Sequence, residues 1–234
     1  MKCQHLSVKA VVFDLDGTLL YTLQDLANAL NWALRQNGMP ERTLSEVRRF
    51  VGNGVQRLVQ RAMPEESVTP LFDKTFSDFK RYYMVHCQET TCPYEGVPEM
   101  LLTLKAHGFK LAIVSNKLQA GVDELCNRYF RDTVTVAIGD QPSLQRKPAP
   151  DMVNEALRIL GVDARDAVYV GDSDIDLLTA RNSGLPCISV LWGYRDRDFL
   201  LEQGATCLAE KTDDVLDILL RGQIHSSRKY HQKR

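Results

Sequence analysis

The stretch Lys9-Ala10-Val11-Val12-Phe13-Asp14-Leu15-Asp16-Gly17-Thr18-Leu19 joins an apolar run to two carboxylates, a glycine and a hydroxyl. The β-branched and aromatic residues before Asp14 predict a buried strand. Two ionised carboxylates, those of Asp14 and Asp16, at the end of a strand need a cation or several hydrogen-bond donors. Mg²⁺ meets this need, because it prefers oxygen ligands and is commonly held by one or two carboxylates together with water or substrate phosphate. An ordinary Asp-Gly turn with both carboxylates in water is the alternative interpretation.

The composition is typical of a soluble globular protein. The chain has 234 residues, 44% of them hydrophobic and 25% charged, which is enough for one large domain or two modest ones. Lysine plus arginine number 29 and aspartate plus glutamate 30, so we expect neither nucleic acid nor a membrane as the main partner. The six cysteines form no C-x-x-C pair, and no apolar window approaches the length of a membrane span. We therefore expect a cytoplasmic protein with free thiols.

A helical segment is predicted between the first strand and the next. Apolar residues recur at helical spacing over 22–37, 55–62 and 68–83, and Thr43-Leu44-Ser45-Glu46 predicts another helix start with a capping residue. No convincing strand pattern precedes 110–115. The gap is far longer than a crossover helix requires, so residues 21–92 are predicted to form a separate helical domain inserted after the first strand.

The remainder alternates regularly between strands and helices. Strands are predicted at 110–115, 133–138, 167–171 and 187–191, and helices at 98–107, 119–130, 150–160, 175–183, near 197–203 and near 213–220. This order predicts an α/β fold with a doubly wound parallel sheet, made of residues 1–20 and 93–222. Residues 223–234 are polar and basic, and are predicted to form a flexible tail.

Polar groups follow the predicted strands where ligands bind in such sheets. Ser115-Asn116-Lys117 ends one strand, Arg146-Lys147-Pro148-Ala149-Pro150 precedes a helix, and Gly171-Asp172-Ser173-Asp174-Ile175-Asp176 ends another strand. Hydroxyl and backbone N–H groups can hold phosphate oxygens, a lysine can neutralise charge, and further carboxylates can complete a Mg²⁺ site. Together with the stretch around Asp14 and Asp16, these three groups therefore indicate phosphate chemistry.

Each group also has an ordinary interpretation. Ser115-Asn116 can be a helix cap, and Lys147 can be a solvated lysine. Arg146 competes with Lys147 as the cation, and Asp174 competes with Asp176 as the second carboxylate. The joint occurrence of all the groups at strand ends, in order, favours the functional interpretation.

Asp14-Leu15-Asp16-Gly17-Thr18-Leu19 resembles the first motif of the haloacid dehalogenase superfamily in its phosphatase form, and the three strand-end groups match the second, third and fourth motifs in order. The resemblance implies a Rossmann-like core and hydrolysis of a phosphate ester through an aspartyl phosphate. It implies that Asp14 is the nucleophile and Asp16 the general acid and base. The Pro-Ala-Pro after Lys147 and the Gly-Asp-x-x-x-Asp spacing of the family favour Lys147 and Asp176 over their rivals.

The same resemblance assigns the remaining site residues. It implies that Ser115, Asn116 and Lys147 bind the phosphoryl group. It implies that Mg²⁺ is held by the Asp14 and Asp172 carboxylates and the Asp16 main-chain carbonyl, with Asp176 supporting the ion or its waters.

The helical insert is similar to the mobile cap of the family, which closes over the site and selects the substrate. Gly52-Asn53-Gly54 is similar to the cap loop of phosphoglycolate phosphatases, as is the late segment Trp192-Gly193-Tyr194-Arg195. The expected substrate is 2-phosphoglycolate or a similar small phosphorylated metabolite. The residues expected to set specificity are Gly52, Asn53, Gly54, Arg57 and Lys117, of which Arg57 and Lys117 are candidates to meet a substrate carboxylate. Tyr21-Thr22 departs from the family, since many relatives carry an acidic residue there.

Three other functions remain open from the sequence. A β-phosphoglucomutase-like phosphosugar mutase and a pyrophosphatase use the same motifs. A non-catalytic binding module on this scaffold is disfavoured, because it has no chemical reason to keep Asp14, Asp16, Ser115, Lys147 and Asp172. The oligomeric state, monomer or homodimer, also stays open.

Overall fold

The computed structural model describes residues 8–52, 54–64 and 69–221. The predictions for Asn53 and for the 223–234 tail therefore concern residues outside the described part of the chain. The strands are β1 (Ala10–Phe13), β2 (Leu20–Tyr21), β3 (Cys92–Pro93), β4 (Lys110–Leu118), β5 (Val136–Asp140), β6 (Ala167–Gly171), β7 (Cys187–Val190) and β8 (Leu208–Ala209). The helices are α1 (Leu23–Gln36), α2 (Leu44–Phe50), α3 (Gly54–Ala62), α4 (Thr69–His86), α5 (Val97–Ala106), α6 (Gln119–Tyr129), α7 (Asp151–Leu160), the 3₁₀ turn Ala164–Asp166, α8 (Asp174–Asn182), α9 (Arg197–Glu202) and α10 (Thr212–Arg221).

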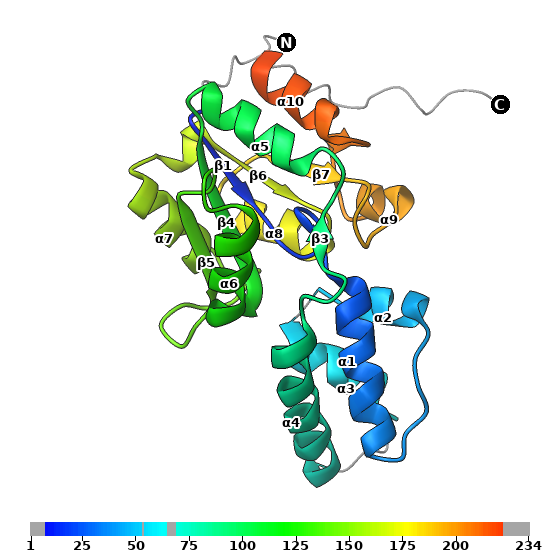
Figure 1. Cartoon of the computed structure of the whole chain (residues 1–234). Coiled ribbons are helices and arrows are strands. Elements are labelled where there is room, and N and C mark those ends of the chain that lie inside the picture. Colours follow the sequence, from blue (N-terminus) through cyan, green and yellow to red (C-terminus); the bar gives the residue numbers. More distant parts are fainter. Residues whose placement is uncertain (1–7, 53, 65–68, 222–234) are drawn as a thin grey trace, which may run out of the picture.

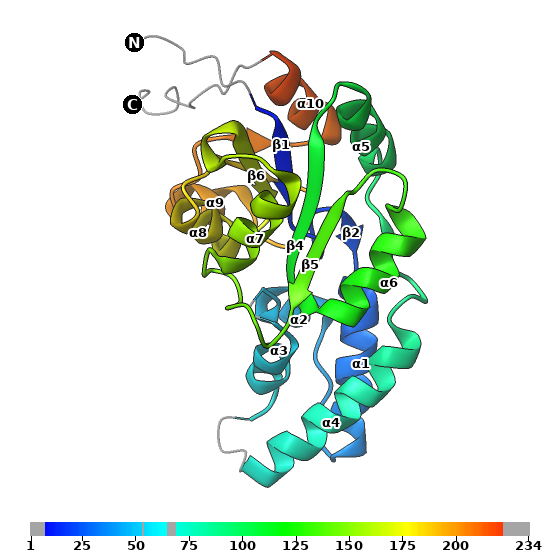
Figure 2. The same ribbon diagram turned by 90° about the vertical axis from the view of Figure 1, so that its left-hand side faces the viewer.

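The central sheet of the described residues has six strands in the order β5-β4-β1-β6-β7-β8, and every neighbouring pair is parallel. Helices α5, α6 and α10 cover one face of the sheet, and α7 and α8 cover the other (Figures 1 and 2). In β1, Val11 and Phe13 belong to one apolar layer and Ala10 and Val12 to the other, as the period of two of a strand requires. The doubly wound α/β fold predicted from the sequence is confirmed.

The edges of the core contain the differences from the sequence prediction. Strand β8 was missed, because two residues are too short to show a pattern. Strand β4 continues to Leu118, through an irregular register with β5 between Val114 and Leu118. Strand β5 begins at Val136, three residues later than predicted.

The expectation that no strand precedes residue 110 in the insert region is wrong. Strands β2 and β3 pair antiparallel, with Leu20 opposite Pro93 and Tyr21 opposite Cys92. They join the sheet to the helical insert, which lies below the sheet in Figure 1. Each strand has only two residues, so its conformation depends on pairing with the other strand and not on a local sequence pattern.

Helices α1 to α4 pack on one another around an apolar cluster that also includes Tyr194 of the core. Buried side chains of that cluster include Leu30, Leu34, Leu58 and Phe79. At the start of α2, the Thr43 hydroxyl accepts a hydrogen bond from the Glu46 N–H, and the Glu46 carboxylate accepts one from the Thr43 N–H, as the sequence predicted. This separate cluster supports the predicted division into a core and an inserted domain, which remains a proposal.

Asp25 anchors the returning connection of the insert. Its buried carboxylate, on the first turn of α1, accepts hydrogen bonds from the N–H and hydroxyl groups of both Thr90 and Thr91. Nearby, the hydroxyls of Thr22 and Tyr194 share a hydrogen bond of 2.9 Å. The two ends of the insert are therefore fixed by buried polar contacts just before β3 and just after β2.

Within the described residues, no helix is long and apolar enough to cross a membrane.

Candidate active site

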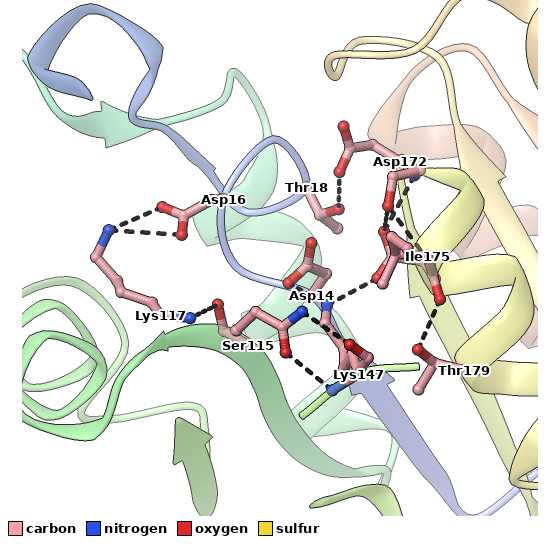
Figure 3. A network of polar contacts seen from close by, with 12 residues as sticks. Asp14, Asp16, Thr18, Ser115, Lys117, Lys147, Asp172, Ile175 and Thr179 are labelled. Atoms are coloured by element: carbon pink, nitrogen blue, oxygen red, sulfur yellow. Dashed lines mark hydrogen bonds and ion pairs between the residues drawn. The ribbon is translucent and has the colours of Figure 1, made fainter. Parts of the chain in front are cut away.

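The carboxyl ends of β1, β4 and β6 lie side by side, because these strands are neighbours in the sheet. Asp14 follows β1, Ser115 lies near the end of β4, and Asp172 follows β6. All three are buried, and Figure 3 shows Asp14 between Ser115 and Asp172. The sequence motifs, separated by up to 158 positions along the chain, are thus brought together by topology.

Lys147 lies at the centre of this group. Its ammonium is 2.7 Å from Asp14 Oδ1 and 2.8 Å from Asp176 Oδ1, and it donates a hydrogen bond to the Tyr169 hydroxyl. Burial disfavours the ammonium, but the two carboxylates outweigh this effect and hold the pKa of Lys147 well above its usual range. The Asn116 side chain binds the main chain of Lys147 at both its N–H and its carbonyl. Asn116 thereby fixes the loop that carries the lysine.

Arg146 and Asp174, the alternative candidates for the cation and the second carboxylate, have other partners. Arg146 is largely exposed and pairs with Asp140 outside the cluster. Asp174 pairs with Arg195. The site geometry therefore favours Lys147 and Asp176, the pair indicated by the family spacing.

Asp176 has both carboxylate oxygens engaged. Oδ1 accepts from Lys147 and from the Tyr169 hydroxyl at 3.1 Å, and Oδ2 accepts from the N–H and hydroxyl of Ser173. The Ser173 hydroxyl in turn accepts from the Asp176 N–H, which makes a capping box at the start of α8. These bonds suit Asp176 to holding Lys147 and the helix start more than to direct coordination of an ion.

Asp172 is held by the loop after β7 and by the first motif. The Tyr194 N–H donates to Asp172 Oδ2 at 2.7 Å, and the Thr18 hydroxyl donates to Oδ1 at 3.2 Å. A Cβ on Gly17 would lie 2.6 Å from Asp172 Oδ2, and one on Gly193 would lie 2.3 Å from Asp172 Cβ. Only glycine allows the backbone to approach Asp172 this closely, and Gly17 also has a φ of +92°.

The carboxylates form a site that fits a divalent cation. One oxygen from each of Asp14, Asp172 and Asp176 lies within 4.8 Å of the others. Burial, followed by repulsion from Asp176, raises the pKa of Asp172 to about 7 and raises that of Asp14 well above its usual range despite Lys147. Three carboxylates with one ammonium leave the cluster short of positive charge, and a hard divalent cation would supply it.

Asp16 points away from this cluster. Its carboxylate lies 3.1 Å from the ammonium of Lys117, which also donates a 2.6 Å hydrogen bond to the Tyr83 hydroxyl. Figure 3 shows both oxygens of Asp16 turned toward Lys117. The candidate acid and base is therefore held beside the nucleophile by a lysine, at the edge facing the helical insert.

A cavity of about 60 Å³ opens over these residues. The core contributes Asp14, Asp16, Ser115, Asn116, Lys117, Lys147, Asp172, Ser173, Tyr194 and Arg195, and the insert contributes Leu26, Val51, Gly52, Gly54, Val55 and Leu58. Among the predicted specificity residues, Gly52, Gly54 and Lys117 line it. Arg57 is exposed and donates to Gln60, so it does not line this cavity.

Arg195 is the cation that the sequence reasoning did not place in the site. Its guanidinium donates to the carbonyls of Arg48 and Val51 at the end of α2 and pairs with Asp174. In return, Arg48 donates to the Gly193 carbonyl. The resemblance of the 192–195 segment to phosphoglycolate phosphatases was the available signal, but it did not distinguish a ligand-facing arginine from a surface one.

Residues 11–190 of the chain match the family of haloacid dehalogenase-like hydrolases. A phosphoglycolate phosphatase of Neisseria meningitidis is 34% identical over 204 residues, which cover 85% of this chain and 87% of the relative. A phosphoglycolate phosphatase of Thiobacillus denitrificans is 35% identical, with 83% and 88% covered. A crystal structure from Lactobacillus delbrueckii subsp. bulgaricus, described as a candidate phosphoglycolate phosphatase, has a TM-score of 0.86 and 35% identity, with 90% and 98% covered.

The chain therefore belongs to the haloacid dehalogenase-like hydrolase family. The resemblance inferred from its four motifs, to the phosphoglycolate phosphatase-like members of that superfamily, is confirmed.

Proposed function

We propose that the protein is a Mg²⁺-dependent phosphatase that hydrolyses a small phosphate monoester, with 2-phosphoglycolate as the leading substrate, through a phosphoryl group carried on Asp14. The observation that carries the proposal is the buried Asp14 carboxylate, 2.7 Å from Lys147 and clustered with Asp172. The relatives named phosphoglycolate phosphatase support the choice of substrate. A cytoplasmic location is part of the proposal.

In the first half of the reaction, a carboxylate oxygen of Asp14 attacks phosphorus and the bond from phosphorus to the ester oxygen breaks. Asp16 gives its proton to that leaving oxygen. Ser115 and Lys147 hold the oxygens of the phosphoryl group, over which the negative charge is spread in the transition state. The alcohol leaves, and the phosphoryl group remains on Asp14.

In the second half, water attacks the phosphorus of the aspartyl phosphate. Asp16, now a carboxylate, removes a proton from that water, the bond from phosphorus to Asp14 breaks, and inorganic phosphate is released. One ionisable group thus serves as acid and then as base, and both the Asp14 carboxylate and the proton on Asp16 are restored at the end of the cycle.

The metal, when bound, neutralises charge on the phosphoryl oxygens and on the nucleophile. The Asp14 and Asp172 carboxylates and the Asp16 main-chain carbonyl would hold it. Asp176 keeps Lys147 in place through its 2.8 Å contact.

A small acidic substrate suits the cavity. The insert closes one side of it with apolar side chains such as Leu26 and Leu58, so polar groups reach the cavity mainly from the core. Lys117, one of the two cations expected from the sequence, and Arg195, which the cavity lining adds, supply positive charge beyond the phosphoryl-binding Lys147 and are the candidates to meet a substrate carboxylate. We include in the proposal that the insert is a cap, since its residues form one wall of the cavity.

Phosphate release from a panel of esters tests the function. The panel contains 2-phosphoglycolate, sugar phosphates, nucleotides, pyrophosphate and an aryl phosphate, each with and without Mg²⁺, and Asp14→Asn is the control. The expected result is Mg²⁺-dependent release that ranks 2-phosphoglycolate first by kcat/KM and is lost in Asp14→Asn. Release from pyrophosphate alone, or sugar phosphate isomerisation that requires a bisphosphate, would replace the proposal with the corresponding alternative.

The acidic-substrate part is tested by Arg195→Met with Arg57→Met as the matched control. We expect Arg195→Met to raise KM for 2-phosphoglycolate by about tenfold, the value of roughly one lost charged contact. The increase should be smaller for an aryl phosphate that has no carboxylate. Arg57→Met should leave both values unchanged, because Arg57 is exposed and outside the cavity lining. Equal increases for the two substrates in Arg195→Met would reject Arg195 as the carboxylate contact.

A further inference from the structure

A continuous chain of contacts runs from the helical insert to Asp16. The Tyr83 hydroxyl on α4 accepts a 2.6 Å hydrogen bond from the Lys117 ammonium, and the same ammonium lies 3.1 Å and 3.5 Å from the two Asp16 oxygens. The side chain of Lys117 is only 5% exposed, so water does little to screen this contact. One buried ammonium thus joins a residue of the insert to the candidate acid and base.

Packing holds both ends of this series of contacts, Tyr83 and Lys117. The Tyr83 ring stacks on Phe79, a fully buried side chain of the insert cluster, at a centroid distance of 5.4 Å. The methylene stem of Lys117 lies against Gly121 of α6, where an added Cβ would be 3.5 Å from it. The Lys117 N–H donates to the Ser115 hydroxyl. The ammonium is therefore directed by its own stem from the core and by Tyr83 from the insert.

We propose that Tyr83 is a positioning residue that acts through Lys117 to place the Asp16 carboxylate. The proposal rests on the proposed function, in which Asp16 protonates the leaving oxygen. It assigns to α4 a role beyond enclosing the substrate, since docking of the insert brings the Tyr83 hydroxyl to Lys117 and so fixes the direction of Asp16.

Proton delivery depends steeply on position, and a misplacement of about 1 Å can cost a reaction up to roughly 100-fold. The demand for a proton depends on the leaving group. An alkoxide, such as the one leaving 2-phosphoglycolate, departs slowly without a proton, whereas a nitrophenolate departs readily as the anion. Misplacement of Asp16 therefore affects alkyl esters more than aryl esters, which a general loss of structure would not do.

The test compares Tyr83→Phe with wild type on 2-phosphoglycolate and on p-nitrophenyl phosphate. The value of kcat/KM is measured because it reports the first phosphoryl transfer, in which the leaving group departs. We expect a loss of about tenfold on 2-phosphoglycolate and of less than about twofold on the aryl ester, a part of the 10² to 10⁴ that acid catalysis contributes. Equal losses on both esters, or no loss on either, would overturn the proposal.

Two controls separate positioning from folding. Tyr82→Phe removes a hydroxyl one residue away on α4, where the ring stacks on Trp32, and should change neither value. In an Asp16→Asn background, Tyr83→Phe should cause no further selective loss on the alkyl ester, since its effect passes through Asp16. A selective loss that persists there would show that Tyr83 acts by another route.

A crystal structure of Tyr83→Phe gives a readout that does not depend on activity. We expect the Lys117 ammonium and the Asp16 carboxylate that it contacts at 3.1 Å to shift from their wild-type positions, while the Asp14 to Lys147 contact is kept. An unshifted Asp16 would refute the positioning role even if the protein acts on a different ester. A shifted Asp16 in a protein that hydrolyses none of the panel would retain the positioning role and reject the proposed function.

Discussion

Replacing Lys147 with methionine removes the one ammonium that separates Asp14 from Asp176. Methionine keeps much of the length and apolar character of the lysine stem, so the change is chiefly one of charge. The Lys147 side chain is 3% exposed, and the carboxylates it contacts at 2.7 Å and 2.8 Å are 11% and 0% exposed. The variant therefore leaves buried carboxylates without their cation.

The expected cost follows from that burial. Removing one partner of a buried ion pair typically destabilises a protein by about 3–5 kcal/mol. At roughly 2–4 °C per kcal/mol for a chain of this size, Tm in a chelator should fall by about 6–20 °C. Turnover should fall by at least about 100-fold, the scale of losing one donor to the phosphoryl oxygens.

Metal should rescue this variant more than it stabilises wild type. With the ammonium gone, and at a pH above about 7 where Asp172 is not neutralised by a proton, a divalent cation is the way to neutralise Asp14 and Asp172, so saturating Mg²⁺ should raise Tm further in Lys147→Met than in wild type. Thermal unfolding with chelator and with Mg²⁺ measures both effects. Arg146→Met is the matched control, because that exposed arginine pairs with Asp140 at the surface and should cost less than about 1 kcal/mol. A Lys147→Met protein as stable as Arg146→Met, or no better stabilised by Mg²⁺ than wild type, would refute the reasoning.

Three further predictions concern the metal site and the returning connection of the insert. Because the pKa of Asp172 is raised to about 7 in the fold, metal-free wild type should lose stability relative to Asp172→Asn as pH rises from about 4 to 7, at up to about 1.4 kcal/mol per pH unit in urea titrations; a parallel pH dependence would contradict this. Gly17→Ala should weaken Mg²⁺ binding measured by calorimetry, whereas Gly38→Ala, with open space around its Cβ, should not. Asp25→Ala should lower the free energy of unfolding by about 3 kcal/mol, since it removes the acceptor of four donors, and a loss below about 1 kcal/mol would show that the connection before β3 does not depend on it.

The sequence was sufficient for the sheet and the centre of the site. The apolar run before Asp14 and the alternation after residue 97 determine a parallel sheet, and parallel strands bring their carboxyl ends to one edge. Asp14, Ser115 and Asp172 therefore converge without any knowledge of the loops. Lys147 joins them from a loop whose position the sequence order alone does not fix, and the family spacing supplied that assignment.

The cavity wall was less accessible to the same reasoning. Arg57 and Arg195 are both arginines close to segments that resemble the family, and the neighbouring sequence does not distinguish the one that lines the cavity from the exposed one. Their positions depend on how the insert meets the 192–195 loop, through contacts such as Arg195 to the Val51 carbonyl. The bond from Lys117 to Tyr83 likewise joins residues 34 positions apart on different parts of the fold.

The most direct test of the central claim is to look for the phosphoryl group on Asp14. Wild-type protein mixed with Mg²⁺ and excess 2-phosphoglycolate is quenched in acid, digested, and analysed by mass spectrometry for a phosphorylated peptide. We expect a phosphoryl adduct on the peptide that contains Asp14, and we expect it to be absent in Asp14→Asn. In Asp16→Asn supplied with an aryl ester the adduct should accumulate, because water is no longer activated. Steady phosphate release without this adduct, unchanged by Asp14→Asn, would contradict it.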